Sequence, residues 1–329
     1  MPKVELHIHL EGAIPAVTLW ELVKKYNGTG EVNNIDELKK KFEYSDFPHF
    51  IDTWVWKNRF LNEYDDFEFI AEQAALNMVK QNIKYAEMFY SPPDFMRKGL
   101  NSKKITEAVY KGISKHKDKI TINLVADLVR DFGPVKAMNT LREINEVKSL
   151  NVVGIGIGGS EHAFPPGVFK DVYEAARNFG FHTSAHAGEA SGAESIWGAL
   201  KELKADRIGH GTRAYEDPSL VEYLKVNSVP IEMCPISNVK TGVVSSIDKH
   251  PIKEFYNKGL NVFVNTDDPE MFNNTMVDEY YECIYSMGFK LSDVKQLALN
   301  AINSAWCSNE MKNSLSDNLI NYFEKNNIQ

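Results

Sequence analysis

Four short stretches of the sequence carry the residue types that bind metal ions and transfer protons. They are HIHLEG at residues 7–12, HAGE at 186–189, RIGHGT at 207–212 and NTDDP at 265–269. Each ends or follows a short run of apolar and β-branched residues, as expected where a β-strand delivers its last side chains to an active site. Imidazoles and carboxylates are common ligands of divalent cations. The four stretches therefore predict a metal-dependent active site.

Four side chains are predicted to ligate the metal: His7, His9, His186 and Asp267. His7 and His9 are two residues apart, so a strand turns both to the same side. Three imidazoles and one carboxylate suit Zn²⁺, with Fe²⁺ and Co²⁺ as alternatives. We expect one ion per chain, because Gly158-Gly159 stands where a lysine bridging two ions would lie. A water bound to the ion would supply hydroxide near neutral pH.

Three further residues are predicted to act on the substrate. His210 can take a proton from the water and stabilise developing charge. Glu189 follows His186 closely and suits a general acid, a role that requires a raised pKa. Asp268 is expected to face the substrate. Each residue also has a purely structural explanation, such as a core histidine or a helix N-cap before proline. So many histidines and carboxylates at the same end of the predicted fold nevertheless favour a catalytic role.

Apolar segments alternate with segments of helical period along most of the chain. The predicted strands cover residues 4–10, 85–90, 120–129, 152–158, 181–186, 207–211, 230–234 and 261–266. This alternation predicts an α/β fold, a (β/α)₈ TIM barrel whose catalytic groups sit at the carboxyl ends of the strands. An open doubly wound sheet is the alternative. It predicts a GxGxxG motif after the first strand, and the sequence has none there.

Residues 15–84 are too many for one connection, so we expect a helical insertion after the first strand. Four apolar residues of this insertion share one helical face: Phe47, Phe50, Ile51 and Trp54. That face either packs into the core or forms a lid over the barrel mouth. Residues 292–325 look helical and would close the outer ring. We expect residues 1–329 to form a single domain.

Composition narrows the class of protein. Of the 329 residues, 43% are hydrophobic and 25% are charged, as in soluble globular proteins. The net charge of −8, without any basic run, argues against a nucleic-acid partner. No apolar run approaches the roughly 20 residues of a membrane span, and the start does not resemble a signal peptide. The three cysteines form no CxxC pair. We expect a cytoplasmic protein, a monomer or weak oligomer, that acts on a small molecule.

In order and spacing, the four motifs resemble those of the adenosine deaminase family of the amidohydrolase superfamily. The resemblance covers about residues 3–310 and includes GIGIGGSE at 154–161 and MCPISN at 233–238. It implies a zinc-dependent TIM barrel that hydrolyses the 6-amino group of a 6-aminopurine. The products would be the 6-oxopurine, such as inosine from adenosine, and ammonia.

The resemblance also implies a role for individual residues. The positions that match zinc ligands are His7, His9, His186 and Asp267. Glu189 matches the donor to purine N1, and His210 matches the residue that activates the water. The positions that match substrate contacts are His9, Glu11, Gly159 and Asp268, with the Gly159 N–H on N3 and Asp268 on N7. Phe47, Phe50, Ile51 and Trp54 match an apolar gate.

Two departures from the family pattern concern the substrate. Family members acting on adenosine commonly have HxHLDG, whereas Glu11 stands here, as it often does in relatives acting on adenine. GIGIGGSE lacks the acidic residues of the commoner DLAGDE, which leaves Ser160 and Glu161 as ribose-side candidates. We therefore predict adenosine, deoxyadenosine or a modified adenosine, with adenine deaminase and aminodeoxyfutalosine deaminase as alternatives. A non-catalytic binding barrel is disfavoured because Glu189 and His210 are both present.

Overall fold

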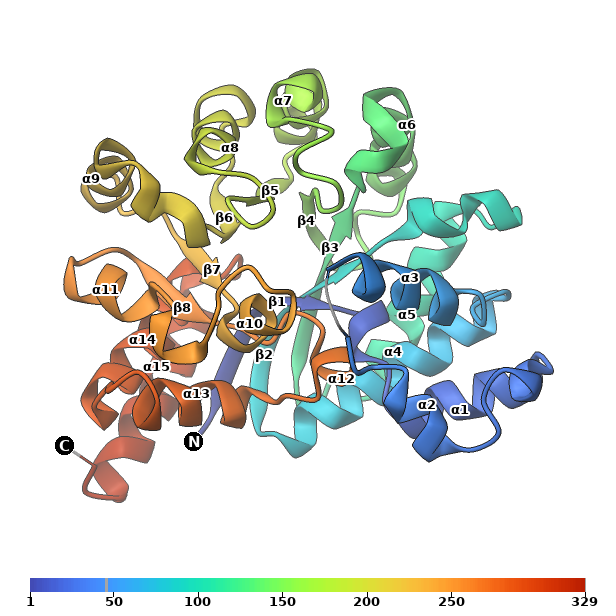
Figure 1. Cartoon of the computed structure of the whole chain (residues 1–329), viewed down its shortest axis with the longest axis horizontal. Helices are drawn as coiled ribbons and strands as arrows, with labels where there is room; N and C mark the ends of the chain where they lie inside the picture. The colour runs from blue at the N-terminus through green and yellow to red at the C-terminus, as the bar shows by residue number, and fades with distance from the viewer. Residues whose placement is uncertain (45–46, 329) are drawn as a thin grey trace.

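The computed structural model describes residues 1–44 and 47–328, without the side chains of residues 47 and 48. Its centre is a parallel sheet of eight strands (Figure 1). The strands are β1 (Lys3–His9), β2 (Ile83–Tyr90), β3 (Thr121–Asp127), β4 (Val152–Gly156), β5 (His182–Ala187), β6 (Arg207–His210), β7 (Ile231–Met233) and β8 (Val262–Val264). Each strand pairs in parallel with the next one in the chain.

The sheet closes on itself between β1 and the segment that follows β8. The N–H of His9 donates to the carbonyl of Asp267 at 2.8 Å, and the N–H of Asp267 donates to the carbonyl of His7 at 3.0 Å. Lower in the barrel, the Asn265 side chain accepts the N–H of Leu6 at 2.9 Å. These bonds complete the predicted (β/α)₈ barrel and place two predicted metal ligands beside a third.

Helices surround the barrel (Figure 1). The α-helices are α1 (Ala16–Lys25), α2 (Ile35–Lys40), α3 (Phe47–Asn58), α4 (Tyr64–Lys80), α5 (Ser102–Ser114), α6 (Gly133–Glu146), α7 (Lys170–Asn178), α8 (Ala193–Gly198), α9 (Pro218–Val226), α10 (Pro235–Lys240), α11 (Ile252–Asn257), α12 (Pro269–Phe272), α13 (Met276–Tyr285), α14 (Leu291–Ser304) and α15 (Asn309–Lys325). A π-helical turn, η6 (Ala199–Leu203), continues α8. The 3₁₀ turns are η1 (Glu11–Ala13), η2 (Gly28–Gly30), η3 (Pro92–Lys98), η4 (Arg130–Phe132), η5 (Pro166–Phe169), η7 (Thr212–Glu216) and η8 (Ile247–Lys249).

Local sequence explains where several of these helices begin. The side chain of Asp217 accepts the N–H groups of Ser219 and Leu220, and Pro218 occupies the first turn of α9, where its missing N–H costs nothing. Glu63 and Asp66 form a reciprocal capping box at the start of α4. These caps satisfy N–H groups that have no partner within the helix.

The helical insertion predicted after the first strand is present. It comprises α1, α2, α3 and α4, of which α4 leads directly into β2. In Figure 1, α3 lies in front of the strand ends, together with α10 and α12. Phe50, Met271 and Phe272 form a small buried apolar cluster there, separate from the main core. The insertion therefore contributes a helix to the barrel mouth.

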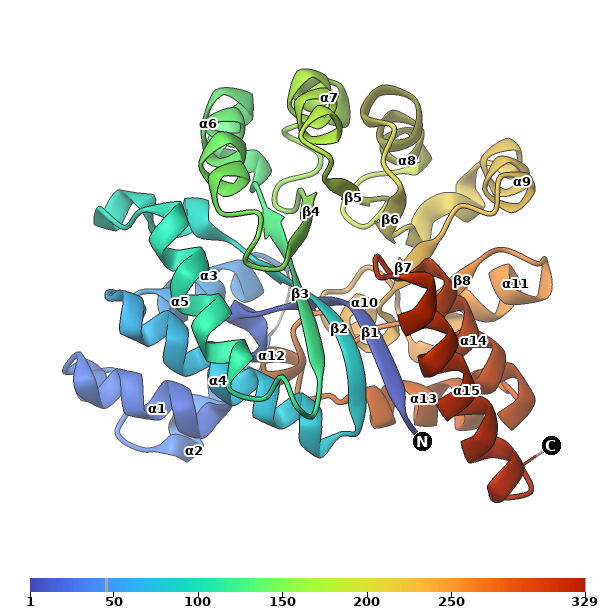
Figure 2. The ribbon, with the colours of Figure 1, turned by 180° about the vertical axis from the view of Figure 1, so that it is seen from behind.

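The C-terminal segment is helical as predicted. Seen from behind, α14 and α15 lie beside the start of β1 (Figure 2). Leu6 of β1, Phe263 of β8 and Leu319 of α15 belong to one buried apolar cluster. This pair of helices covers the seam at which the barrel closes.

At the end opposite the mouth, the barrel interior contains charged side chains and a tryptophan ring packed against them. Arg207 forms ion pairs of 2.6 Å with Glu87 and with Glu232, all three fully buried. The Trp306 ring lies 3.4 Å from the Arg207 guanidinium. Glycine at an inward position of β4 makes room, since a Cβ on Gly154 would come within 2.6 Å of that ring. The alternating glycines of GIGIGG thus serve packing below the site.

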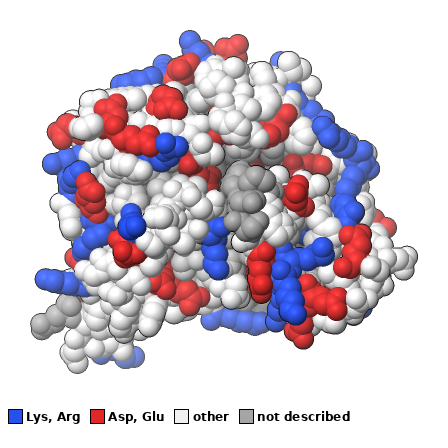
Figure 3. Space-filling view, viewed as in Figure 1, with Lys and Arg blue, Asp and Glu red and all other residues white. Residues whose placement is uncertain are grey.

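The surface carries mixed charge. On the face shown in Figure 3, basic and acidic side chains alternate over the described residues, without a continuous basic field. Among residues 1–44 and 47–328, we find no helix that combines the length and the apolar character of a membrane span.

Candidate active site

The four predicted metal ligands converge at the barrel mouth. His7 Nε2 and His9 Nε2 lie 3.1 and 3.2 Å from His186 Nε2. Asp267 Oδ1 lies 3.4 Å from Nε2 of both His7 and His9. Ligand atoms around a tetrahedral Zn²⁺ lie about 3.3 Å from one another. These separations fit a single divalent cation among the four atoms.

The charges of the group favour a cation as well. Burial and the neighbouring imidazoles of His7 and His210 keep the pKa of His186 well below its usual value, so its lone pair is free. Burial works against protonation of His7 too, but hydrogen bonds to Asp267 and Glu232 raise its pKa to about 10. Positive charge is therefore stabilised at this point, and a metal ion can replace the proton.

His210 belongs to the same group of side chains. One ligand atom each from His7, His186, His210 and Asp267 lies within 4.8 Å of the others. His9 nevertheless makes the closer contacts, at 3.2 and 3.4 Å, whereas His210 Nε2 lies 3.5 Å from Glu189 Oε2. By these contacts His9 fits the fourth ligand position better than His210, which lies beside the group.

Side chains behind the ligands hold their orientation, which is typical of metal sites. Glu232 on β7 lies 2.6 Å from His7 Nδ1, which leaves Nε2 to face the site. Burial raises the pKa of Glu232, but Arg207 and His7 outweigh it, so the carboxyl stays ionised. The hydroxyl of Ser237 donates to Asp267 Oδ2 at 2.7 Å. Glu232 was not among the residues predicted from the sequence, although a lone carboxylate inside a short buried strand is a usable signal.

An unusual backbone conformation turns His210 into the site. Its φ is +60°, in the left-handed region that costs non-glycine residues roughly 1–2 kcal/mol. The preceding inward position is Gly209, where a Cβ would come within 3.0 Å of His7. Asp267 has the same feature, with φ +67°. Backbone strain at two residues of one site is typical of functional sites, whereas packing alone gives no reason to retain it.

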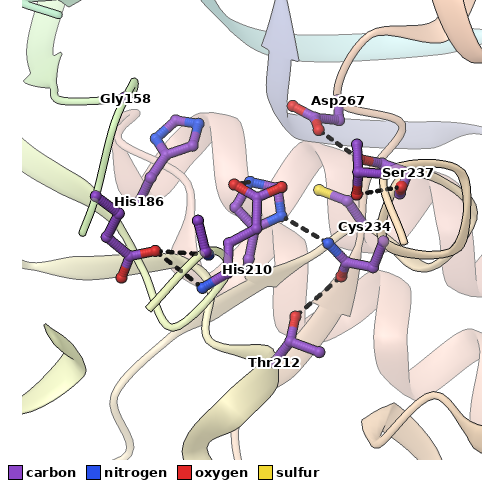
Figure 4. A network of polar contacts seen from close by, with 12 residues as sticks. Gly158, His186, His210, Thr212, Cys234, Ser237 and Asp267 are labelled. Carbon is purple, nitrogen blue, oxygen red and sulfur yellow. Dashed lines mark hydrogen bonds and ion pairs between the residues drawn. The ribbon is translucent and has the colours of Figure 1, made fainter. Parts of the chain in front are cut away.

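A hydrogen-bond network fixes the His210 ring (Figure 4). Asn238 Oδ1 accepts from Thr212 at 3.0 Å and contacts His250 Nε2 at 3.1 Å. The Asn238 amide nitrogen therefore faces His210 Nδ1, at 3.2 Å, and donates to it. Burial lowers the pKa of His210 to about 3, so the ring is neutral. With Nδ1 accepting, its hydrogen lies on Nε2, toward Glu189.

Glu189 has the raised pKa that a general acid needs. Burial is the main cause, and the carboxylates of Asp267 and Glu161 add to it. Glu161 is 3% exposed and does not line the cavity, so the ribose-side contact that we expected for it stays a prediction. Instead its carboxylate accepts four backbone N–H groups of the Glu189 loop, those of Gly188, Glu189, Ala190 and Ser191. Glu161 thus holds the segment that carries the acid.

Asp268 and Gly159, which we predicted to contact the substrate, both line the cavity of the site. Asp268 Oδ1 is buried and lacks a partner among the described residues. Burial and neighbouring Asp267 raise the pKa of Asp268 well above its usual value, so it can donate a hydrogen bond. Gly12 allows its approach, because a Cβ there would lie 1.8 Å from Asp268 Oδ1. Gly159 has φ +97°, which favours glycine, and it lines the same cavity.

A cavity of about 320 Å³ joins these groups, at the lower end of the roughly 300–1,000 Å³ of small-molecule sites. Its lining includes His9, His186, Glu189, His210, Asp267 and Asp268. A hollow of about 610 Å³ beside α11 and α14 is larger, but no His, Asp or Glu lines it among the described residues.

The apolar face of α3 covers one side of the cavity. Phe50, Ile51 and Trp54 all line it, and the Phe50 ring stacks on Phe272 at 5.2 Å. This placement favours the interpretation that the face forms a lid over the barrel mouth, and not that it packs into the core. The side chain of Phe47, the fourth predicted gate residue, lies outside the described part of the structure.

Glu11 does not line the cavity. It is 1% exposed, and its Oε1 accepts the N–H of Ser91 at 3.0 Å. Its role as a substrate contact stays a prediction. The cavity is lined instead by Asp94, Asp127 and Asp131, none of which we had identified from sequence.

The comparisons with known proteins agree with this geometry. The sequence matches the family model "Adenosine deaminase" over residues 2–322. It is 33% identical to an adenosine deaminase of Shewanella loihica, over 96% of this chain and 97% of that protein. It is 30% identical to an adenine deaminase of Marinomonas sp., over 95% of this chain and 93% of that protein.

Solved structures resemble it throughout. An adenine deaminase from Arthrobacter aurescens has a TM-score of 0.94 and 28% identity, covering 98% of this chain and 99% of that one. A cog1816 amidohydrolase from Burkhoderia ambifaria, determined with bound Zn, has a TM-score of 0.90 and 27% identity, covering 99% and 91%.

Proposed function

The chain belongs to the adenosine deaminase family, and we therefore propose that it deaminates adenosine, or an adenosine modified on its sugar, by zinc-dependent hydrolysis. The protein is a hydrolytic deaminase of adenine-like substrates. The metal and the exact substrate are the parts that we infer.

One observation carries the proposal. Four ligand atoms from β1, β5 and the segment after β8 lie 3.1–3.4 Å from one another, in the contacts measured between them. They face a cavity that also holds the carboxyl of Glu189. Scattered structural histidines would not produce this grouping beside a proton donor. It supports a hydrolytic site built for one metal ion.

The proposed metal site consists of His7, His9, His186 and Asp267. When bound there, zinc would lower the pKa of a water molecule enough to make hydroxide available near neutral pH. Glu232 supports the site from behind by holding the His7 ring through Nδ1. The Ser237 hydroxyl holds the Asp267 carboxylate by donating to its Oδ2.

Glu189 supplies the proton on which the reaction depends. Attack of the water oxygen at C6 breaks the aromaticity of the purine and places electrons on N1. The Glu189 carboxyl, protonated because burial raises its pKa, donates to N1 at that moment. The C6–NH₂ bond then breaks, one proton of the water leaves with the amine as ammonia, and the other restores the Glu189 carboxyl. The sum is adenosine plus water giving inosine plus ammonia.

His210 was expected to act as a general base on the water and also to stabilise developing charge. Its Nδ1 accepts from Asn238, so Nε2 carries the hydrogen and points toward the Glu189 side of the site. That arrangement favours the second role, in which an N–H donor stabilises charge on the attacking oxygen.

Two further contacts would orient the purine. A protonated Asp268 donates to N7, a ring nitrogen that only accepts. The backbone N–H of Gly159 donates to N3, and the absence of a side chain lets the base come close. The apolar face of α3 would then exclude water above the ring.

Adenine is the second candidate substrate. Two observations favour it: Glu11 stands at the position where relatives acting on adenine often have glutamate, and the adenine deaminase of Arthrobacter aurescens is similar over nearly its full length. Aminodeoxyfutalosine remains the third.

Ammonia release from adenosine, 2′-deoxyadenosine, adenine and AMP, with metal content measured in the same preparation, tests the proposal. We expect about one zinc per chain and turnover of a nucleoside. A metal-free preparation, or one that leaves all four compounds unchanged after zinc is supplied, would contradict it.

A further inference from the structure

The proposed metal ligand Asp267 has a backbone conformation that needs support from its surroundings. Its φ is +67°, in the left-handed region that is unfavourable for residues with a side chain. Such a conformation persists only where neighbouring contacts fix the chain around it. Two parts of the structure can be fixed in this way: the carboxylate of Asp267 and the peptide group between Thr266 and Asp267.

The carboxylate is held from α10. The hydroxyl of Ser237 donates to Asp267 Oδ2 at 2.7 Å (Figure 4). The next residue of the same helix, Asn238, faces His210 Nδ1 at 3.2 Å. The placement of this short helix therefore decides where two side chains that support the site lie.

Glu279 of α13 holds α10 in turn. It is 0% exposed, and its two carboxyl oxygens lie 3.4 and 3.3 Å from the backbone nitrogen of Ile236, whose N–H they accept. Ile236 directly precedes Ser237, so this bond fixes the part of α10 that reaches the metal ligand. We call the path from Glu279 through Ile236 and Ser237 to Asp267 the α10 arm.

A second path leads from Glu279 to the peptide group before Asp267. The amide of Asn274 donates to Glu279 Oε1 at 2.8 Å and to the carbonyl of Thr266 at 3.4 Å. That carbonyl belongs to the peptide plane whose orientation sets φ of Asp267. We call the path from Glu279 through Asn274 to Thr266 the Thr266 arm. The two arms act on Asp267 from its side chain and from its backbone.

A carboxyl group is unexpected on this face of α13. The other buried residues of the helix are Met276, Tyr280 and Cys283, and Cys283 lies one turn after Glu279. Burial of a carboxyl costs free energy that an apolar side chain would not, unless hydrogen bonds offset it. Glu279 does not line the cavity of the site. Its contacts with the two arms are therefore the reason to keep an acid there.

From these contacts we propose that Glu279 is a positioning residue for metal binding, which holds Asp267 in its left-handed conformation through the α10 arm and the Thr266 arm. The inference rests on the proposed metal site. It adds a residue of the outer helix α13 on which the affinity of that site depends.

The test measures the zinc dissociation constant of the 329-residue protein by competition with a chelator. Glu279→Met keeps the length of the side chain and removes both acceptor oxygens, so we expect the constant to rise at least tenfold. Cys283→Ala changes another buried side chain of α13 and controls for lost stability. It should stay within threefold of the wild type.

Glu279→Gln is the conservative variant. Burial raises the pKa of Glu279 well above its usual value, so the folded protein contains the neutral acid, which an amide resembles in shape and charge. Oε1 accepts from both Ile236 and Asn274, and glutamine retains this oxygen. We expect its zinc dissociation constant to stay within threefold of the wild type.

Two further backgrounds separate the arms. Ser237→Ala interrupts the α10 arm, and Asn274→Ala interrupts the Thr266 arm. Because one path is already lost in each background, Glu279→Met should raise the zinc dissociation constant by a factor at least threefold smaller there than in the wild type. A variant that acted only through general loss of stability would keep its full effect in both.

The outcomes separate this inference from the proposed function. A rise of less than tenfold in Glu279→Met, an equal rise in Cys283→Ala, a glutamine variant as weak as the methionine variant, or a full effect in both backgrounds would each overturn the role of Glu279 while the metal site stands. A wild-type protein that binds no zinc would refute the proposed function itself.

Discussion

The carboxylate of Glu161 accepts the backbone N–H of Glu189 at 3.2 Å, and it accepts the N–H groups of the two following residues at 2.8 and 3.0 Å. A side chain from the segment after β4 thus fixes the loop after β5 that presents the proposed acid. Hydrogen bonds to a charged acceptor contribute roughly 1.5–3 kcal/mol each. The position of the Glu189 carboxyl therefore depends on a residue that does not line the cavity.

Glu161→Gln is expected to lower kcat by about tenfold with little change in KM. An amide has one acceptor oxygen, and its NH₂ group would face an N–H donor of the loop, so the loop shifts and the proton donor loses alignment. Glu161→Ala would leave four N–H groups without a partner and lower the free energy of unfolding by about 3 kcal/mol. Steady-state kinetics and urea unfolding measure the two effects.

Glu202→Gln, an exposed change on the helical turn after α8, is the matched control. A Glu161→Gln enzyme with wild-type kcat would show that the clamp does not position Glu189.

Glu189→Gln is expected to keep its metal and lose about 10²–10⁴-fold in kcat, the range assigned to general acid catalysis. The amide is similar in size but cannot deliver a proton to N1. The matched control is Glu174→Gln, an exposed residue of α7. Elemental analysis for metal and ammonia release for turnover are measured on one preparation. Unchanged turnover would remove the assigned role.

The barrel was predictable because its determinants are local. Period-two and helical patterns, prolines at helix starts and the four motifs each depend on neighbouring residues. The HxH motif placed His7 and His9 on one side of β1, and their Nε2 atoms indeed share contacts with His186. The residues at which individual strands end were less predictable than the strands themselves. We expected residues 152–158 to be extended, whereas β4 ends at Gly156.

Residues whose role depends on distant partners were missed. Glu161 was interpreted as a ribose contact because it follows the fourth strand, but its partners lie 27–30 positions away on another loop. The His182 ring stacks on Trp306 at the barrel floor, yet its side chain is 53% exposed. Cys234, which directly follows the apolar strand β7, is 0% exposed. Whether a side chain is buried can be predicted from the local sequence pattern, whereas its hydrogen-bond partners cannot.

His186→Ala is expected to lower the metal content from about one ion per chain to near zero. His186 Nε2 lies within 3.2 Å of Nε2 of both His7 and His9, so its loss opens the centre of the group. His182→Ala removes another imidazole of the same strand, at its exposed end, and should keep the metal. Elemental analysis after dialysis against a chelator distinguishes the two variants. Equal metal content in both would show that the ion binds elsewhere.

Trp54→Ala is expected to raise KM about tenfold and change kcat less. Trp54 lines the cavity and anchors α3 through its bond to Asp94, so its loss exposes the bound substrate to water. Trp56→Ala on the same helix is the control, because its indole bonds to Glu31 and lies outside the cavity. An equal effect of both changes on KM would indicate general damage to α3 instead of a lid.

A buried carboxyl below the metal site should make stability depend on pH. Glu5 on β1 is 1% exposed, and its oxygen accepts the backbone N–H of Thr266 at 3.1 Å. Burial raises the pKa of Glu5 from near 4.5 to about 7, against the opposing effect of the Thr266 hydrogen bonds. The folded protein therefore keeps a proton that the unfolded chain has already released. Its contribution to stability is complete below pH 4.5 and is lost as the pH rises through 7.

Linkage gives the size of the effect: about 1.4 kcal/mol per pH unit across this window, or about 3 kcal/mol in all. Glu5→Gln keeps the carbonyl oxygen that accepts from Thr266 and removes the titration. The difference in free energy of unfolding between Glu5→Gln and the wild type should therefore grow in favour of the variant from pH 5 to pH 8. Urea unfolding of both proteins at matched metal content measures it, and taking the difference cancels every other titrating group. Glu324→Gln, exposed on α15, should give a constant difference over the same range. A constant difference for Glu5→Gln as well would show that Glu5 titrates alike in the folded and unfolded states, and it would contradict the prediction.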